Sequence, residues 1–211
     1  MSTFLELMQS DYPPDLARAM VVNFRIAGLS LLFGLLLGLP LAVALAGGRG
    51  WRRMVAPLMG LMRAAPTFVV MFFLLNIIPY EFLFAGRVVT PSAATIVALS
   101  LVPYAAAYVA DNGAEALTSL RRGSSEAALL FGPNLLRAFF VLVMSSSTGA
   151  AIGVNEGVAV VLREAERWEA LSDKLVVFGI GVLAFGIVFQ AGFALMRAAV
   201  RLVTRRRARA A

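Results

Sequence analysis

The sequence predicts an all-α integral membrane protein with five transmembrane helices, and three observations support this prediction. Of the 211 residues, 60% are hydrophobic and only 15% are charged, whereas about a quarter of a soluble domain is charged. The mean hydropathy is +0.84. The apolar residues gather in five long runs, and these lack the polar stripe that a helix of a soluble bundle presents to water. The lipid bilayer is therefore the expected solvent.

The five apolar runs have lengths that suit membrane-spanning helices. A helix rises about 1.5 Å per residue, so about 20 residues cross a hydrocarbon core roughly 30 Å thick. With their flanks, the predicted spans are about 20–46, 60–80, 88–112, 135–155 and 175–200. The second and fourth runs are the shortest, so four or six spans are the alternatives. The whole chain, 1–211, is predicted to form a single transmembrane domain.

The basic residues indicate the orientation of the chain. Five spans place the two termini on opposite sides of the membrane. The side that holds the C-terminus and the connections 46–64 and 110–138 carries thirteen of the nineteen basic residues: Arg49, Arg52, Arg53, Arg63, Arg121, Arg122, Arg137, Arg197, Arg201, Arg205, Arg206, Arg207 and Arg209. The other side carries Arg18, Arg25, Arg87, Arg163, Arg167 and Lys174. The positive-inside rule therefore predicts a cytoplasmic C-terminus and an N-terminus outside.

The high positive charge does not predict a nucleic-acid partner. The net charge is +7, but the arginines lie at the ends of apolar runs rather than on one basic face. The C-terminal Arg-rich tail is better explained as a juxtamembrane anchor to anionic membrane lipids.

The composition also excludes most enzymatic chemistry. The chain has no Cys and no His, which removes thiol catalysis, thiolate metal sites and the commonest general base and zinc ligand. It has no Gly-x-x-x-x-Gly-Lys-Ser/Thr phosphate loop, because its only lysine, Lys174, lies in Ser-Asp-Lys-Leu. We therefore expect no catalytic residue, metal site or bound cofactor in this chain. It is predicted not to be an enzyme.

The connection 113–134 contains a candidate docking element. Its Gly123-to-Gly132 segment predicts a short helix that Gly132 ends, with Pro133 opening the next helix. The small Ala127 and Ala128 beside Glu126 would let this helix approach a protein cleft closely. Leu129, Leu130 and Phe131 would supply apolar contacts of the helix-in-groove kind. Arg121 and Arg122 have two interpretations: they pair with acidic groups of a partner or with lipid phosphates, or they simply anchor the chain at the cytoplasmic surface.

Four segments together resemble one protein family. They are Met62-Arg63-Ala64-Ala65-Pro66-Thr67, Ala107-Tyr108-Val109-Ala110-Asp111, Gly123-Ser124-Ser125-Glu126-Ala127-Ala128, and Ser147-Thr148-Gly149-Ala150-Ala151-Ile152-Gly153-Val154. In this order they resemble the polar amino-acid branch of ATP-binding-cassette (ABC) importer permeases. That branch has Arg-Gly-Thr-Pro, Ala-Tyr-x-(Ala/Ser)-Glu, Gly-Gln-x-Glu-Ala-Ala and Thr-Ser-Leu-Ala-x-x-Ile-Gly-Val. The resemblance covers roughly residues 15–205.

The sequence also departs from this pattern. Ser124 replaces the usual Gln, and Asp111 replaces the usual Glu. Asn23 and Phe24 stand where a Thr-Leu pair is common, and no proline follows Leu142. Such departures are typical of a divergent subfamily or of one half of a heterodimer.

The resemblance implies a type I ABC importer permease fold and a set of partners. The cytoplasmic EAA loop would place Gly123, Glu126, Ala127, Ala128, Phe131, Gly132 and Pro133 in the coupling contact with a separate ABC ATPase, which would bind the ATP and Mg. The other implied partners are a second permease copy or paralogue and an extracytoplasmic solute-binding protein, at the bacterial inner membrane. The alternatives are a methionine-type importer permease and a nontransporting scaffold or signalling partner of an ATPase.

Polar groups at membrane depth are costly and are therefore candidates for a substrate path. Together with the family motif at the second span, they give a candidate path set: Arg63, Pro66, Thr67, Asn112, Ser147, Thr148, Asn155 and Glu156. The serines also fit close helix packing. Glu156 has three open interpretations: contact with a cationic solute, a pair with Arg25, or a place in the headgroup region. The amphipathic segment 156–174 is predicted to lie on the outer surface, with Trp168 at headgroup level.

Overall fold

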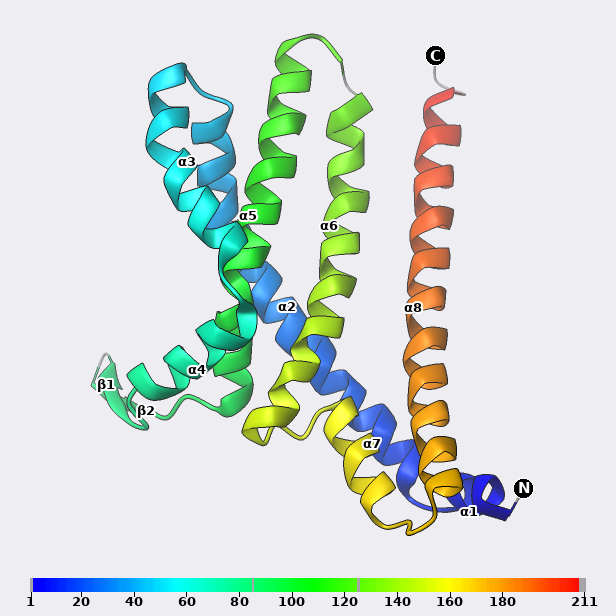
Figure 1. The fold of residues 1–211 in the computed structure, drawn as a ribbon. Coiled ribbons are helices and arrows are strands. Elements are labelled where there is room, and N and C mark those ends of the chain that lie inside the picture. Colours follow the sequence, from blue (N-terminus) through cyan, green and yellow to red (C-terminus); the bar gives the residue numbers. More distant parts are fainter. Residues whose placement is uncertain (1, 85, 125, 209–211) are drawn as a thin grey trace. The chain divides into compact units, whose positions relative to one another are not determined.

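The computed structural model describes residues 2–84, 86–124 and 126–208, and the chain divides into two compact units. The first unit contains residues up to 19 and from 157 onward, and the second contains residues 20–156. Figure 1 shows the helices and the small hairpin that build them.

The first unit is built from α1 (Ser2–Gln9), the start of α2 (Tyr12–Leu45), α7 (Gly157–Glu166) and α8 (Leu171–Ala208). A hydrogen bond connects α1 to α8 within this unit: the Thr3 hydroxyl donates to Asp173 Oδ1 at 2.8 Å. The Tyr12 hydroxyl donates to the carbonyl of Val177 at 3.4 Å. The N-terminus therefore lies beside the start of α8.

The second unit holds the remainder of α2, then α3 (Arg49–Ala64), α4 (Thr67–Ile77), α5 (Ala93–Arg121), α6 (Glu126–Ser145) and the 3-10 helix η1 (Ser146–Ile152). Strands β1 (Phe82–Phe84) and β2 (Arg87–Val89) form a short antiparallel hairpin between α4 and α5, with Phe82 opposite Val89. Helices α5 and α6 run side by side in opposite directions (Figure 1).

Helix α5 is the centre of the second unit because small residues let α2 approach it closely. Gly34 and Gly38 are one turn apart on α2. A Cβ at Gly34 would lie 2.5 Å from the Cβ of Ala105, and one at Gly38 would lie 2.6 Å from the carbonyl oxygen of Ala106. This is the small-xxx-small packing that brings membrane helices together. The Ala105 and Ala106 side chains are fully buried.

Four described helical segments are long and apolar enough to cross a membrane: Tyr12–Leu45, Ala93–Arg121, Ala128–Ile152 and Leu171–Ala198. The pair α3 and α4 becomes a fifth if it is counted as one broken span. The all-α membrane fold is therefore confirmed, and the β1–β2 hairpin is a small addition to it.

The second predicted span differs from the single helix expected over 60–80. Helix α3 ends at Ala64, α4 begins at Thr67, and the two are bent by 94°. Ala65 precedes a proline, which disfavours the helical region for it, and it is extended with φ −66° and ψ 113°. Pro66 then begins α4 at φ −70°. The apolar run is continuous in sequence but broken in space.

The predicted short helix ending at Gly132 is wrong, and so is the extent of the predicted loop 113–134. Helix α5 continues to Arg121, and α6 runs without a break from Glu126 through Gly132 and Pro133 to Ser145. The glycine that ends a helix here is Gly123, at φ +80°. Its N–H donates to Leu120 O, and Ser124 N–H donates to Ser119 O, which is the Schellman arrangement. Pro133 removes only one hydrogen bond from α6, and packing against α5 maintains the helix.

Candidate functional site

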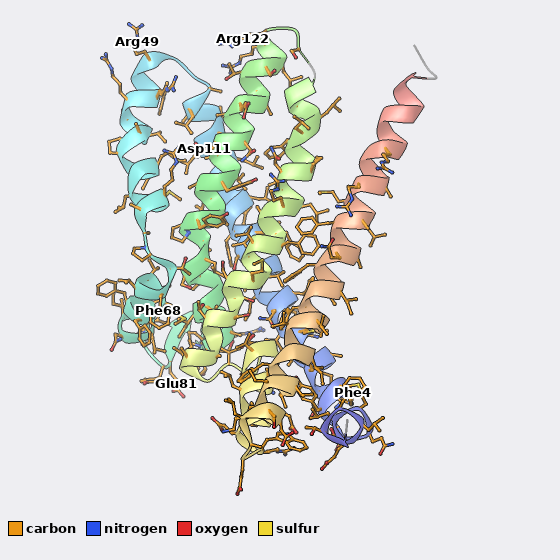
Figure 2. All side chains as sticks on the ribbon, turned by 45° about the vertical axis from the view of Figure 1, so that its right-hand side comes forward. Phe4, Arg49, Phe68, Glu81, Asp111 and Arg122 are labelled. Atoms are coloured by element: carbon orange, nitrogen blue, oxygen red, sulfur yellow. The ribbon has the colours of Figure 1, made fainter. Side chains whose placement is uncertain are left out.

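An ion pair joins two of the sequence motifs. Arg63 lies in the last turn of α3, and Asp111 lies in the middle of α5. The Arg63 Nε donates to Asp111 Oδ2 at 3.0 Å, and its Nη2 donates to Asp111 Oδ1 at 2.5 Å. Figure 2 labels Asp111 on α5. The two hydrogen bonds fix the plane of the guanidinium group against the carboxylate. They attach α3 to α5 three residues before the bend at Pro66.

The Arg63–Asp111 pair lies at one end of a cavity of about 500 Å³ between α3 and α5. Charged and hydroxyl side chains provide much of its wall: Arg52 from α3, and Glu115, Thr118, Ser119 and Arg122 from α5 and its C-cap. The wall residues recur at helical spacing on both helices. One face of α3 therefore meets one face of α5 across a polar space.

Asn112 takes part in helix pairing. Asn134 Nδ2 donates to Asn112 Oδ1 at 2.7 Å, and Asn112 Nδ2 donates to the carbonyl of Tyr108 at 2.9 Å. The two asparagines therefore connect α6 to α5 at the residue that directly follows Pro133. Interhelical hydrogen bonds of this kind stabilise membrane helix pairs.

A fully buried polar cluster lies where α6 passes into η1. The Asn23 amide on α2 donates to Ser146 Oγ at 2.9 Å, to Ser147 Oγ at 3.4 Å and to Glu156 Oε2 at 2.8 Å. Asn23, Ser146 and Glu156 each have 0% exposure. Glu156 is brought here by Gly153, which ends η1 at φ +82° and turns the chain back. The Glu156 carboxyl group is thus enclosed by protein rather than exposed at headgroup level.

The remaining path candidates occupy other places. Pro66 and Thr67 form the corner between α3 and α4. The Thr148 hydroxyl donates to the carbonyl of Ser145 within η1, and Asn155 lies in the short connection before Glu156. Of the path set, Arg63 lines the α3–α5 cavity, and Ser147 and Glu156 belong to the buried cluster around Asn23. The other members lie at the Pro66 corner, at the α5–α6 contact and around η1. The role of the path set in solute passage stays a prediction.

The coupling residues lie at the turn from α5 to α6. Gly123 ends α5, whereas Ala128 and the residues after it belong to α6. Leu129 and Leu130 are exposed at 38% and 56%. Phe131 points toward α5, where its Cε2 would lie 3.7 Å from a Cβ at Gly113. Ser125 and the side chains of Glu126 and Ala127 lie outside what the structure describes. Leu129 and Leu130 therefore provide the exposed apolar surface, and Phe131 packs internally.

The similarity of this chain to known proteins lies in its fold as a whole. No family model and no curated protein matches the sequence. Two solved structures match the fold. One is an amino acid ABC transporter with histidines, with a TM-score of 0.64 at 15% identity over 92% of this chain and 98% of that one. The other is the MetNI methionine ABC transporter in inward-facing conformations, with a TM-score of 0.58 at 20% identity over 87% of this chain and 95% of that one.

This chain has the fold of an ABC importer permease. At these identities the likeness is one of fold, and it extends over nearly the full length of both chains. Within the permease fold, sequence analysis missed the role of Asn23 and the pairing of Asp111 with Arg63. Both positions depart from the family pattern in the sequence: Asn23 stands where Thr is common, and Asp111 has a shorter side chain than the usual Glu. Neither departure identified the partner residue.

A second cavity lies within the first unit. Its volume is about 260 Å³, and Glu6, Ser10, Glu164, Arg167 and Trp168 are among its lining residues. Arg167 pairs with Glu164 at 3.0 Å. The Trp168 indole Nε1 is buried without a hydrogen-bond partner. The position of Trp168 at headgroup level stays a prediction.

Proposed function

We propose that this chain is the transmembrane subunit of an ATP-driven ABC importer, forming the translocation path for a small polar solute, with an amino acid as the preferred class. The observation that carries the proposal is the permease fold shared with an amino acid and a methionine ABC transporter over nearly the whole chain. The amino acid ABC transporter of similar fold was solved with histidines, and the resemblance to the polar amino-acid branch favours the same substrate class.

The proposed importer contains three further kinds of subunit. A separate ABC ATPase binds ATP and Mg and docks at the α5–α6 turn, around Gly123, Glu126 and the exposed Leu129 and Leu130. A second permease copy or paralogue completes the path, and an extracytoplasmic binding protein delivers solute. The N-terminus lies outside and the C-terminus in the cytoplasm of a bacterial inner membrane.

The continuity of α6 changes the expected coupling mechanism. A flexible corner at Gly132 and Pro133 would let a docked helix pivot before moving the span. In this structure the docking residues form the first turns of α6 itself. A push on Leu130 would therefore pass along a single helix, through the Asn134–Asn112 hydrogen bond, to α5.

The first test is co-purification of the tagged full chain with its ATPase in mild detergent. We expect Glu126→Lys and Gly132→Trp to abolish ATPase recovery while membrane insertion is unchanged. Gly132 has open space around it, as does Gly60, so Gly60→Trp is the matched steric control. Glu81→Lys, in the connection after α4, is the matched charge control. Equal ATPase recovery from the docking variants and their controls would refute docking at this turn.

A reconstituted complex then separates transport from scaffolding. A transporter shows ATPase activity that rises with solute and binding protein, whereas a scaffold binds the ATPase without solute dependence. Histidine and methionine should be tested side by side. A methionine-type importer is the second candidate, because the MetNI transporter shares the fold at 20% identity.

A further inference from the structure

Two arginines lie at the end of the α3–α5 cavity away from the Arg63–Asp111 pair, an end that we call its mouth. Arg52 precedes Arg63 by three helical turns on α3, and Arg122 follows Asp111 by three turns on α5. Each separation is about 16 Å along a helix axis. Helices α3 and α5 run in opposite directions, and Figure 2 shows Arg49 and Arg122 at the same end of the unit. Arg52 and Arg122, which both line the cavity, therefore lie at that end, away from the Arg63–Asp111 pair.

These two arginines differ from Arg63 in their partners. Arg63 is neutralised by Asp111 through two hydrogen bonds. Neither Arg52 nor Arg122 forms an ion pair with another residue in the part of the chain that the structure describes. Neighbouring Arg121 is used differently, because its Nη1 donates to the carbonyl of Ala46. The cavity mouth thus holds two guanidinium groups with free donors.

The surroundings favour an oxyanion as the group that these donors bind. Arginine presents planar N–H donors that match phosphate oxygens in pairs. Ser119, one turn before Arg122, lines the same cavity and adds a hydroxyl. A volume of about 500 Å³ accommodates a phosphate with a small attached group.

We propose that the mouth of the α3–α5 cavity binds a phosphate group between Arg52 and Arg122. The charge count places this end at the cytoplasmic surface, where basic pockets between transmembrane helices bind the headgroups of anionic lipids. A free phosphate compound would offer the same oxygens. The inference concerns ligand binding to the chain alone and does not depend on transport.

Glu115 determines the charge of the chemical group that can enter the cavity. It lies two turns from Arg122 on the same face of α5, about 10 Å along the axis, and also lines the cavity. Its carboxylate opposes a second negative charge deeper in the cavity. The phosphate group is therefore held at the mouth, and a group attached to it that enters the cavity is neutral or positively charged.

The test uses the purified, delipidated full chain in neutral detergent. Binding of phosphatidylglycerol is compared with that of diacylglycerol, which lacks the phosphate, by native mass spectrometry. Inorganic phosphate is titrated against chloride at equal ionic strength, with thermal stability as the readout. The variant is Arg52→Gln with Arg122→Gln. The matched control is Arg49→Gln with Arg53→Gln, which removes the same charge from the same end, outside the cavity wall.

We expect the cavity variant to bind the phosphate probe about a hundredfold more weakly than the wild type, since each of the two lost charge-assisted hydrogen bonds contributes about tenfold, with the control close to wild type. Selective retention of phosphatidylglycerol identifies a lipid source, and a response to inorganic phosphate alone identifies a free phosphate compound. The single variant Arg52→Gln, expected to lose about half of the effect on a logarithmic scale, serves if the double variant does not fold. Equal losses in variant and control would overturn the proposal. So would capture of only an acidic protein segment, with neither probe bound.

Discussion

Replacing Asn23 by Ala should destabilise the permease fold by about 2–4 kcal/mol. The Asn23 amide donates to Glu156 Oε2 at 2.8 Å and to Ser146 Oγ at 2.9 Å. Losing the donor leaves a fully buried carboxyl oxygen without that partner, which costs about 1–3 kcal/mol, and the hydroxyl bond adds about 1 kcal/mol. The 3.4 Å bond to Ser147 is long and adds little.

The assay is equilibrium unfolding of the detergent-solubilised chain, combined into a double-mutant cycle with Glu156→Leu. Leucine has no oxygen to accept the hydrogen bond from Asn23, so the cycle isolates the Asn23–Glu156 interaction. Interhelical hydrogen bonds in membrane proteins average about 0.6 kcal/mol in such cycles. Full burial of the carboxyl group should raise this coupling to about 1–2 kcal/mol.

Asn76→Ala provides the control for this prediction. The exposed Asn76 amide donates only to the carbonyl of Phe72 in its own helix, so its loss should cost under about 0.5 kcal/mol. A coupling between Asn23 and Glu156 below 0.5 kcal/mol, or equal losses for Asn23→Ala and Asn76→Ala, would show that the buried cluster does not stabilise the fold.

Three further changes test the packing directly, each by unfolding midpoint in the same detergent. Gly34→Val should cost about 2 kcal/mol or more, since even a Cβ would lie 2.5 Å from that of Ala105. Gly28→Val, at an open position, is its control, and equal losses would argue against close α2–α5 contact. Gly132→Ala should stabilise α6 by about 0.5–1 kcal/mol, and a loss instead would contradict a helical Gly132. Asp111→Asn should cost less than about 1 kcal/mol because the pair with Arg63 is half exposed, and a loss above 2 kcal/mol would show that this ion pair holds α3 in place.

The sequence predicted the spanning helices well because their signal is one of composition. A run of about 20 apolar residues indicates a membrane helix whatever its neighbours are. The helices over Ala93–Arg121 and Leu171–Ala198 contain the predicted third and fifth spans almost entirely. Their ends were less accurate, because β2 and the connection that follows it occupy the predicted start of the third span, 88–92.

Helix breaks were predicted less well because local preferences compete with packing. Gly132 and Pro133 together predicted a turn, yet α6 continues through both. Ala65 and Pro66 belong to one apolar run, yet the helix breaks there. Proline disfavours a helix in both places. In the structure α6 continues along α5, whereas the chain bends at Pro66 so that α4 packs against α5 in a different direction from α3.

The sequence could predict individual residues of the candidate site, but not which of these residues contact each other. Arg63 and Asp111 both belong to recognised motifs, but their contact depends on the register of α3 against α5. Asn23 was noticed as a departure from the family pattern. The sequence around Gly153 does not show that the turn there brings Glu156 into contact with Asn23. Long-range pairing therefore required the structure.

The hydrogen bond between Thr3 and Asp173 spans 170 positions of the sequence. During synthesis, α1 therefore waits for α8, and the first unit cannot close before residue 173 has been made. Closing so long a loop costs conformational entropy, so this unit is expected to form slowly.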